Sequence, residues 1–148
     1  ERAHIIGLDG TGAVLASAKQ GTGVPEILEG LFDASLSMDL QRMPELFCGF
    51  KRRPGEGPIL YPVACAPQSW AAGSIFMLLE ACLGMNIDAS RQQIVFHRPS
   101  LPESLGTVGI MGLTVGGASV DLVLERHAHN VGINVLRREG DLEIMTLN

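Results

Sequence analysis

The chain has 148 residues, of which 46% are hydrophobic and 18% are charged. This length suits a single ordinary domain, and the apolar content excludes an intrinsically disordered chain. The formal net charge of −5 argues against nucleic-acid binding, because phosphate contacts require clustered positive charge; the basic runs 51–53 and 137–138 are too short to change that conclusion.

Residues 1–23 are ambiguous between a helix and a hairpin, and we expect a helix although its glycines weaken it. A second helix is predicted over 25–36. Pro25 suits its first turn, and Ile27, Leu28 and Leu31 fall on one side of it.

The segment 38–66 shows neither helical nor strand periodicity. It contains four prolines and several glycines, which interrupt regular structure. A structureless loop longer than about 15 residues within a compact domain is usually functional. We therefore expect the chemistry of the protein to lie in this loop.

The clearest helix is predicted over 67–83. Pro67 suits its first turn, and Gly84 suits the position just past its end. Between them almost every residue is apolar, and a helix that is apolar all round must be surrounded by protein. We therefore expect this chain, taken alone, to expose a large apolar face.

From residue 91 onward the apolar residues alternate with polar ones, which predicts β-strands. The turns are expected at Gly116-Gly117, His129-Asn130 and Gly140-Asp141. The strands are expected at 93–97, 108–113, 120–125, 131–136 and 142–146.

The predicted fold class is therefore α+β, with a helical segment over 1–88 and an antiparallel β tail over 89–148. In the tail, we expect one set of alternating side chains to face the helices, because a strand places every second residue on the same face. This set is Val120, Leu122, Leu124, Ile133 and Val135.

Two carboxylates lie in the loop that precedes the 67–83 helix. Glu45 has Met43, Leu46 and other apolar residues as sequence neighbours, a setting in which an unpaired charge is costly. Such a glutamate is either tuned for proton transfer or bonded to Arg42 or to backbone N–H groups. Glu56, which lies between two glycines, is typical of a solvated turn.

Three motifs in this region resemble one known family: PELFCGF at 44–50, RPGEGP at 53–58 and YPVACAPQSWAA at 61–72. They resemble the C-terminal part of bacterial amylo-α-1,6-glucosidases, the glycogen-debranching-enzyme-like proteins. More broadly, they are similar to the end of the catalytic domain in (α/α)6-barrel glycosidases. The resemblance is dense over 25–86 and weaker over the β tail.

The resemblance implies that Glu45 is the general base of an inverting glycosidase. Such enzymes need a carboxylic acid and a carboxylate roughly 6.5–9.5 Å apart, with a water between them. Tyr61 and Trp70 become candidates to stack on sugar C–H groups, and Gln68 becomes a candidate to bind hydroxyls. The alternative for all three is a packing role, which is the more common one for a tryptophan in a helix.

The same resemblance places the catalytic acid upstream of the matched motifs, and an (α/α)6 barrel needs many more helices than this chain supplies. We therefore expect the C-terminal piece of a longer enzyme that acts on α-glucans and is inactive by itself. Its partners would be the glucan and either the rest of the barrel or a second copy. The alternative is a non-catalytic α+β domain that binds carbohydrate or a partner subunit.

Other candidate residues favour structural roles. His127 and His129 could place two imidazoles on one strand face, but no third ligand is evident, so a surface hairpin is favoured over a metal site. Cys65 and Cys82 have apolar sequence neighbours, which predicts raised thiol pKa values and inert side chains. Three cysteines without a C-x-x-C pair favour a reducing, cytoplasmic compartment. No signal peptide, membrane span or cofactor motif is evident.

Overall fold

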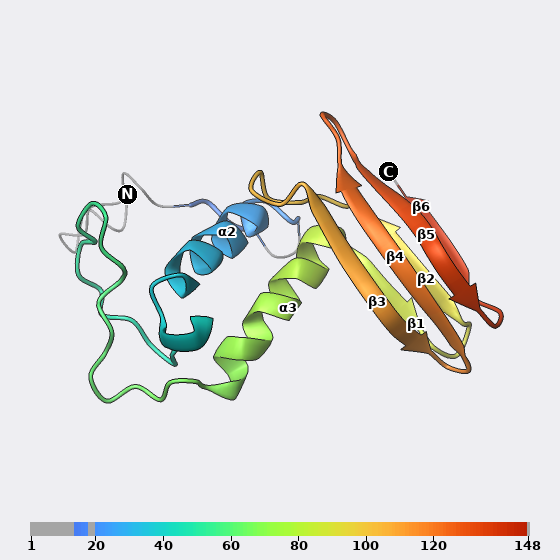
Figure 1. Cartoon of the computed structure of the whole chain (residues 1–148). Helices are drawn as coiled ribbons and strands as arrows, with labels where there is room; N and C mark the ends of the chain where they lie inside the picture. Colours follow the sequence, from blue (N-terminus) through green and yellow to red (C-terminus); the bar gives the residue numbers. More distant parts are fainter. Residues whose placement is uncertain (1–13, 18–19, 148) are drawn as a thin grey trace.

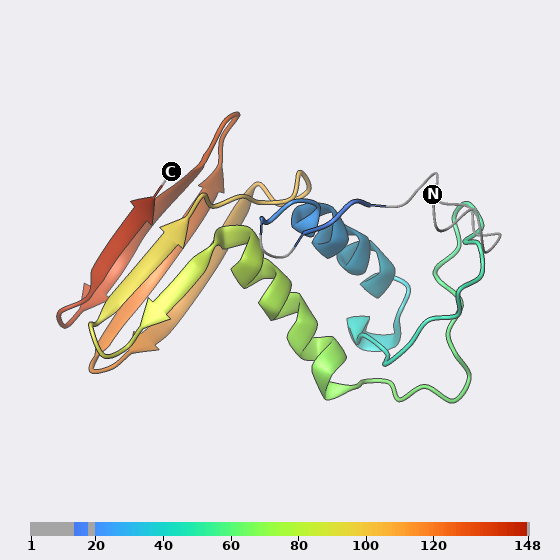
Figure 2. The ribbon, with the colours of Figure 1, turned by 180° about the vertical axis from the view of Figure 1, so that it is seen from behind.

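A computed structural model describes residues 14–17 and 20–147 of the chain. Within these residues the chain has two parts, a helical part followed by a part built of β-strands (Figure 1). The predicted α+β class is therefore confirmed. The view from behind shows that the second of the two helices runs directly into the first strand (Figure 2).

The first helix of the described chain, α2, spans Val24–Ser35, close to the predicted 25–36. Gly23 precedes it with a φ of 71°, and a Cβ at this position would lie 2.3 Å from the carbonyl oxygen of Leu15. Only glycine fits both the left-handed conformation and this close approach. Val24 and Leu28 lie buried on the face that packs against the second helix.

The helix predicted over 1–23 is wrong for the residues that can be described. Ser17 and Thr22 form an antiparallel bridge, and the backbone N–H of Ser17 donates to the carbonyl oxygen of Thr22 over 2.8 Å. This pairing makes a tight turn, which Gly21 permits with a φ of 73°. The rest of that predicted helix, residues 1–13 and 18–19, lies outside the described residues.

The second helix, α3, spans Ser69–Leu83 and begins two residues later than predicted. Pro67 follows a cis peptide bond and stands before the helix, while Gln68 is still extended with φ −118° and ψ 136°. The helix ends at Gly84, whose φ is 53°. A Cβ there would lie 2.0 Å from the carbonyl oxygen of His97, so glycine is required both for the turn and for space.

The two helices pack through a small apolar cluster and leave the opposite face of α3 uncovered. The buried centre of the cluster is Val24, Leu28 and Cys82. On the far side, Trp70 is 62% exposed, and Phe76 and Met77 are exposed as well. The described residues therefore leave uncovered the apolar helix face that the sequence predicted.

The six described strands form two three-stranded sheets. The first sheet has the order β1-β2-β6 and the second has the order β3-β4-β5, which is an antiparallel meander. The strands are β1 (Met85–Asp88), β2 (Gln93–His97), β3 (Thr107–Val115), β4 (Ala118–Arg126), β5 (Val131–Glu139) and β6 (Glu143–Leu147).

Two features of the β part differ from the prediction. β6 does not extend the antiparallel meander but pairs with β2 in parallel, so that Gln93 stands opposite Glu143. β1 was not predicted; it starts directly after Gly84, where the secondary structure changes from helix to strand. Apolar alternation cannot distinguish these pairings, because it specifies the buried face of a strand and not its neighbour.

The inner faces of the two sheets meet in the main core. Val120, Leu122 and Leu124 of β4 are fully buried against Ile94 and Phe96 of β2. The alternation along β4 is thus as predicted, but these side chains face the other sheet rather than the helices.

Only the end of α3 reaches this core, through Leu79 and Leu83. On β5 the two residues predicted to face inward are less buried than those on β4. Ile133 packs against the core while partly exposed, and Val135 is 46% exposed. β5 lies at the edge of its sheet, where less of the facing sheet covers it.

Candidate functional site

The predicted functional loop is partly ordered as an irregular hairpin, which we name the 43–68 hairpin. Phe47 and Leu60 form an antiparallel bridge at its middle. Near its base, the backbone N–H of Glu45 donates to the carbonyl oxygen of Cys65 over 2.8 Å. A short 3₁₀ helix, η1 (Asp39–Gln41), precedes the hairpin where no regular structure was predicted.

An ion pair ties the tip of the hairpin to α2. The guanidinium of Arg52 donates to the carboxylate of Asp33, and it also donates to the carbonyl oxygen of Glu56. Within the basic run at 51–53, Arg52 therefore has a positional role. Because both side chains of the pair are partly exposed, its contribution to stability is modest.

Glu45 is partly buried at the base of the hairpin. Its Oε2 atom accepts a hydrogen bond from the backbone N–H of Cys65 over 3.3 Å. Of the two bonding partners that the sequence suggested, this is the backbone group and not Arg42. The predicted apolar enclosure is incomplete among the described residues, since Met43 is buried but Leu46 and Phe50 are exposed.

Glu56 lies in a turn at the tip of the hairpin, as the sequence predicted. Its backbone N–H donates to the carbonyl oxygen of Arg53, and its carboxylate lies 3.8 Å from the guanidinium of the same residue. Both side chains of this pair are exposed. Glu56 is therefore a solvated turn residue that matches Glu45 in chemistry but not in position.

Gln68 lies at the base of the hairpin, as Glu45 does, and Trp70 lies two residues farther on in α3. The backbone N–H of Gln68 donates to the carbonyl oxygen of Met43, and its side-chain oxygen caps α3 by accepting the N–H of Ser69 over 3.0 Å. That cap uses the side-chain oxygen of Gln68 and not its NH₂ group. Trp70 lies in the first turn of α3 and does not pack in a helical core.

Tyr61 is 46% exposed and follows Leu60, which pairs with Phe47 farther along the hairpin. The structure therefore brings Glu45 and Gln68 to the same end of the hairpin and leaves Tyr61 nearer its middle. None of these residues or Trp70 lines any of five cavities in the described part of the chain.

The largest of these cavities, about 760 Å³, lies where the end of α3 meets β1 and β2. Cys82 lines it, and burial raises the pKa of the Cys82 thiol to about 11, with a further rise from the charge of Glu26. The predicted inert character of Cys82 thus has a physical basis. Cys65, in contrast, is exposed, so its predicted apolar surroundings are wrong.

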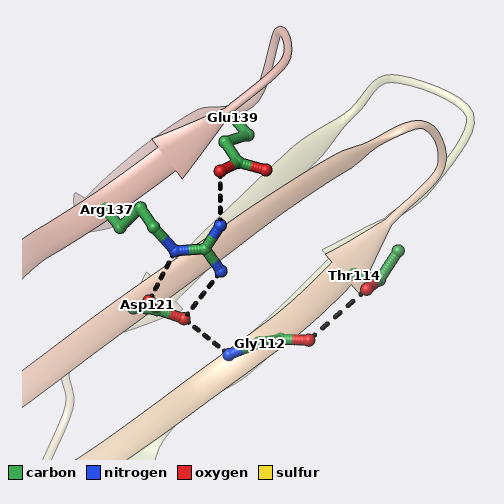
Figure 3. Close-up of polar contacts among 5 residues, drawn as sticks. All are labelled: Gly112, Thr114, Asp121, Arg137 and Glu139. Atoms are coloured by element: carbon green, nitrogen blue, oxygen red, sulfur yellow. Dashed lines mark hydrogen bonds and ion pairs between the residues drawn. The ribbon is translucent and has the colours of Figure 1, made fainter.

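The outer face of β4 carries a charged network that the sequence analysis did not identify (Figure 3). Arg137 donates to Asp121 and also lies 2.7 Å from the carboxylate of Glu139. The Arg137 bond lowers the pKa of Asp121, with a further contribution from the backbone N–H of Gly112. Asp121 lies in the predicted strand 120–125, but Arg137 and Glu139 lie beyond the predicted end of the next strand at residue 136. The pairing of Asp121 with Arg137 also stands beside a register shift that no sequence pattern indicates.

No three His, Cys, Asp or Glu side chains in residues 14–17 and 20–147 lie close enough together to hold a metal ion. His129 lies in the turn predicted at His129-Asn130 and His127 lies two residues before it; the N–H of His127 donates to the carbonyl oxygen of Asn130. Within the same residues, no helix has the length and apolar content needed to cross a bilayer.

Comparison with known proteins gives one short match. A stretch of 28 residues is 68% identical to elongation factor 4 of Trichodesmium erythraeum (strain IMS101), covering 19% of this chain and 5% of that protein. No family model matches the chain. No solved structure matches it either. A match over so small a part of either protein shows neither a shared fold nor a shared activity.

Proposed function

We propose that this chain is the C-terminal part of a glycosidase that acts on α-glucans, of the amylo-α-1,6-glucosidase type, with Glu45 as its general base. The proposal starts from the motif resemblance over 44–72. The observation that carries it further is the position of Glu45, whose carboxylate lies on a hairpin between two helices with one oxygen held by a backbone N–H.

The bonding of the Glu45 carboxylate suits a general base. Oε2 accepts the N–H of Cys65, which orients the carboxylate and leaves Oε1 to accept a proton from water. The water then attacks the anomeric carbon, while a carboxylic acid on the opposite side protonates the departing oxygen. In this proposal that acid comes from a part of the enzyme outside these 148 residues.

The residues around Glu45 have the chemistry to bind a sugar. The side-chain NH₂ of Gln68 can donate to a hydroxyl, since only the side-chain oxygen is used in capping α3. The exposed faces of Trp70 and Tyr61 can stack on sugar C–H groups. Together they would hold the glucan while Glu45 activates the water.

The uncovered face of α3 supports the part of the proposal that concerns a larger barrel. Trp70, Phe76 and Met77 form an apolar surface on that face, and such a surface normally contacts other protein. Neighbouring helices of an (α/α)6 barrel would cover it. The β sandwich, which has a core of its own, would then stand as an appended unit after the last helix.

A second candidate function is a non-catalytic domain that binds carbohydrate. The exposure of Trp70 and Tyr61 favours it, because aromatic side chains open to solvent can bind sugars without any chemistry. The two candidates differ in what they require of Glu45. Replacement of Glu45 by Gln in the full-length protein should lower turnover by about 10²-fold or more in the first and leave binding and any activity unchanged in the second.

A further inference from the structure

Two adjoining cavities lie at the end of the β sandwich where β4 turns into β5. Their volumes are about 480 Å³ and 230 Å³, and they share part of their walls. We name them together the Arg98–His129 groove. One wall is the segment that follows β2, and the other is the β4–β5 turn. The shared residues are Pro99, His129, Asn130 and Val131.

The titratable groups that line this groove are all basic. They are Arg98, Arg126, His127 and His129, and neither aspartate nor glutamate lines either cavity among the residues described. This is unexpected in a chain with 16 acidic residues against 11 Lys and Arg. The groove therefore concentrates positive charge in an acidic protein, and such a site attracts anions.

The nearest acidic side chains leave most of this charge unneutralised. Glu103 lies 3.6 Å from Arg126, but it is highly exposed and solvent weakens the pair. Glu125 accepts a hydrogen bond from the side chain of Asn134 over 3.2 Å. No ion pair involves Arg98 in the part of the chain that the structure describes.

The backbone holds Arg98 in an unusual conformation. Its φ is 46°, in the left-handed region, and it precedes Pro99, which disfavours helical conformations in the residue before it. The backbone N–H of Arg98 donates to the carbonyl oxygen of Leu147 over 2.7 Å, which ties this residue to the end of β6. Residues with a strained backbone conformation are common at binding sites, where contacts with the surrounding fold hold that conformation in place.

We propose that the Arg98–His129 groove binds the phosphate group of a phosphate monoester. A guanidinium presents a planar fork of N–H donors that matches phosphate oxygens, and neutral or charged imidazoles add further donors. The larger cavity lies in the size range of small-molecule sites, so it has room for an organic group attached to the phosphate. The site is on the β sandwich and does not depend on the role of Glu45.

Isothermal titration calorimetry of the 148-residue chain tests this proposal with inorganic phosphate, glucose 6-phosphate and uncharged glucose as probes. The first two should bind, and glucose should not bind to this groove. Tighter binding of glucose 6-phosphate than of inorganic phosphate supports a monoester as the ligand, whereas equal affinity would contradict it and indicate a site for free phosphate. Because hydrogen bonds to charged groups are stronger than those between neutral groups, Arg98→Gln should weaken phosphate binding by about tenfold or more.

Two further variants make the result specific. His129→Gln should also weaken binding, because His129 lines both cavities and is exposed, so its replacement leaves the core intact. Arg53→Gln removes the same charge from an exposed position on the hairpin and should leave the affinity unchanged. Thermal melts establish that each variant is folded. Absence of phosphate binding to the unmodified chain, or equal weakening by Arg53→Gln and Arg98→Gln, would overturn the proposal.

Discussion

Arg137 on β5 donates from Nε to the Oδ2 atom of Asp121 on β4 over 2.7 Å, and this pair lies where the register of the sheet shifts on both sides of β4. Between β3 and β4 the shift falls between Ile110 and Leu113, and there Asp121 accepts the backbone N–H of Gly112 over 2.6 Å. One carboxylate thus holds a group from each neighbouring strand (Figure 3).

Replacement of Asp121 by Asn should lower the melting temperature at neutral pH. Asn keeps an acceptor for Gly112 but loses the charge that Arg137 contacts. Because the folded state lowers the pKa of Asp121, the stabilisation is present above the ordinary value of 3.8 and is lost as the pH falls through the lower folded pKa. The difference from the unmodified chain should therefore shrink in acid.

Asp141→Asn, in the turn before β6, serves as the control for this series of melts, since it removes an exposed carboxylate. An equal loss of melting temperature in the two variants at neutral pH would contradict a specific role for the Asp121 carboxylate.

The core can be tested with two residues that stand opposite each other in the sheet. Leu122 is fully buried between the two sheets, whereas its register partner Val135 is 46% exposed. Leu122→Ala should lower the free energy of unfolding by about 2–5 kcal/mol, as expected for loss of a buried leucine. Val135→Ala should change it by about 0.5 kcal/mol or less. Chemical denaturation measures the two changes in the free energy of unfolding. Equal changes would contradict the burial of Leu122 between the two sheets.

Much of the β part could be predicted from the sequence because its signals are local. The alternation along β4 identifies Leu122 and Leu124 as inward-facing. Dipeptides that contain glycine or asparagine mark the turns, at 116–117, 129–130 and 140–141. The pairing of β6 with β2 could not be predicted in this way. It joins residues about 50 positions apart, and no local pattern specifies which strand becomes the neighbour.

The three cysteines should differ strongly in their reactivity. Cys65 is exposed and should react first with a thiol reagent at neutral pH. Cys82 should react only when the chain unfolds, because it is buried and its pKa of about 11 leaves little thiolate. Mass spectrometry of labelled peptides over time measures the order. Labelling of Cys82 as fast as Cys65 in the folded chain would contradict the packing of the end of α3.

The uncovered face of α3 should make the 148-residue chain self-associate. Trp70 is the only tryptophan, so its fluorescence reports on this face. Its emission should be that of a solvent-exposed indole in dilute solution and should shift to shorter wavelength as the concentration rises. Phe76→Ser should reduce the association seen by light scattering, whereas Phe50→Ser, on the hairpin, should not. A stable monomer that binds no hydrophobic dye would contradict this expectation.

Prediction of the candidate site from the sequence was less complete than prediction of the sheet. Glu45 could be identified from its motif, but the group that bonds to it is the N–H of Cys65, twenty residues away across an irregular hairpin. Trp70 was a candidate to stack on a sugar, and the alternative, packing in a helical core, is wrong because its side chain is exposed. The path of the loop decides which backbone N–H reaches a carboxylate. Because nearly every residue type has such a group, the sequence carries no signal for this kind of partner.

The central claim is that Glu45 activates water, and two glutamates of the same hairpin allow a matched comparison. Glu45→Gln keeps the shape of the side chain and an oxygen that can accept the N–H of Cys65, but it removes the base. Glu56→Gln makes the same chemical change in an exposed turn. General base catalysis contributes about 10²–10⁴-fold, so the two variants should differ in kcat by at least that order.

The decisive measurement is kcat of the full-length enzyme on a branched α-glucan, with the two variants assayed side by side. The account predicts a loss of about 10²-fold or more for Glu45→Gln with little change in KM, and near-normal turnover for Glu56→Gln. The isolated 148-residue chain should hydrolyse nothing, because it lacks the opposing acid that this account requires. Full activity in Glu45→Gln would contradict the assignment of the base.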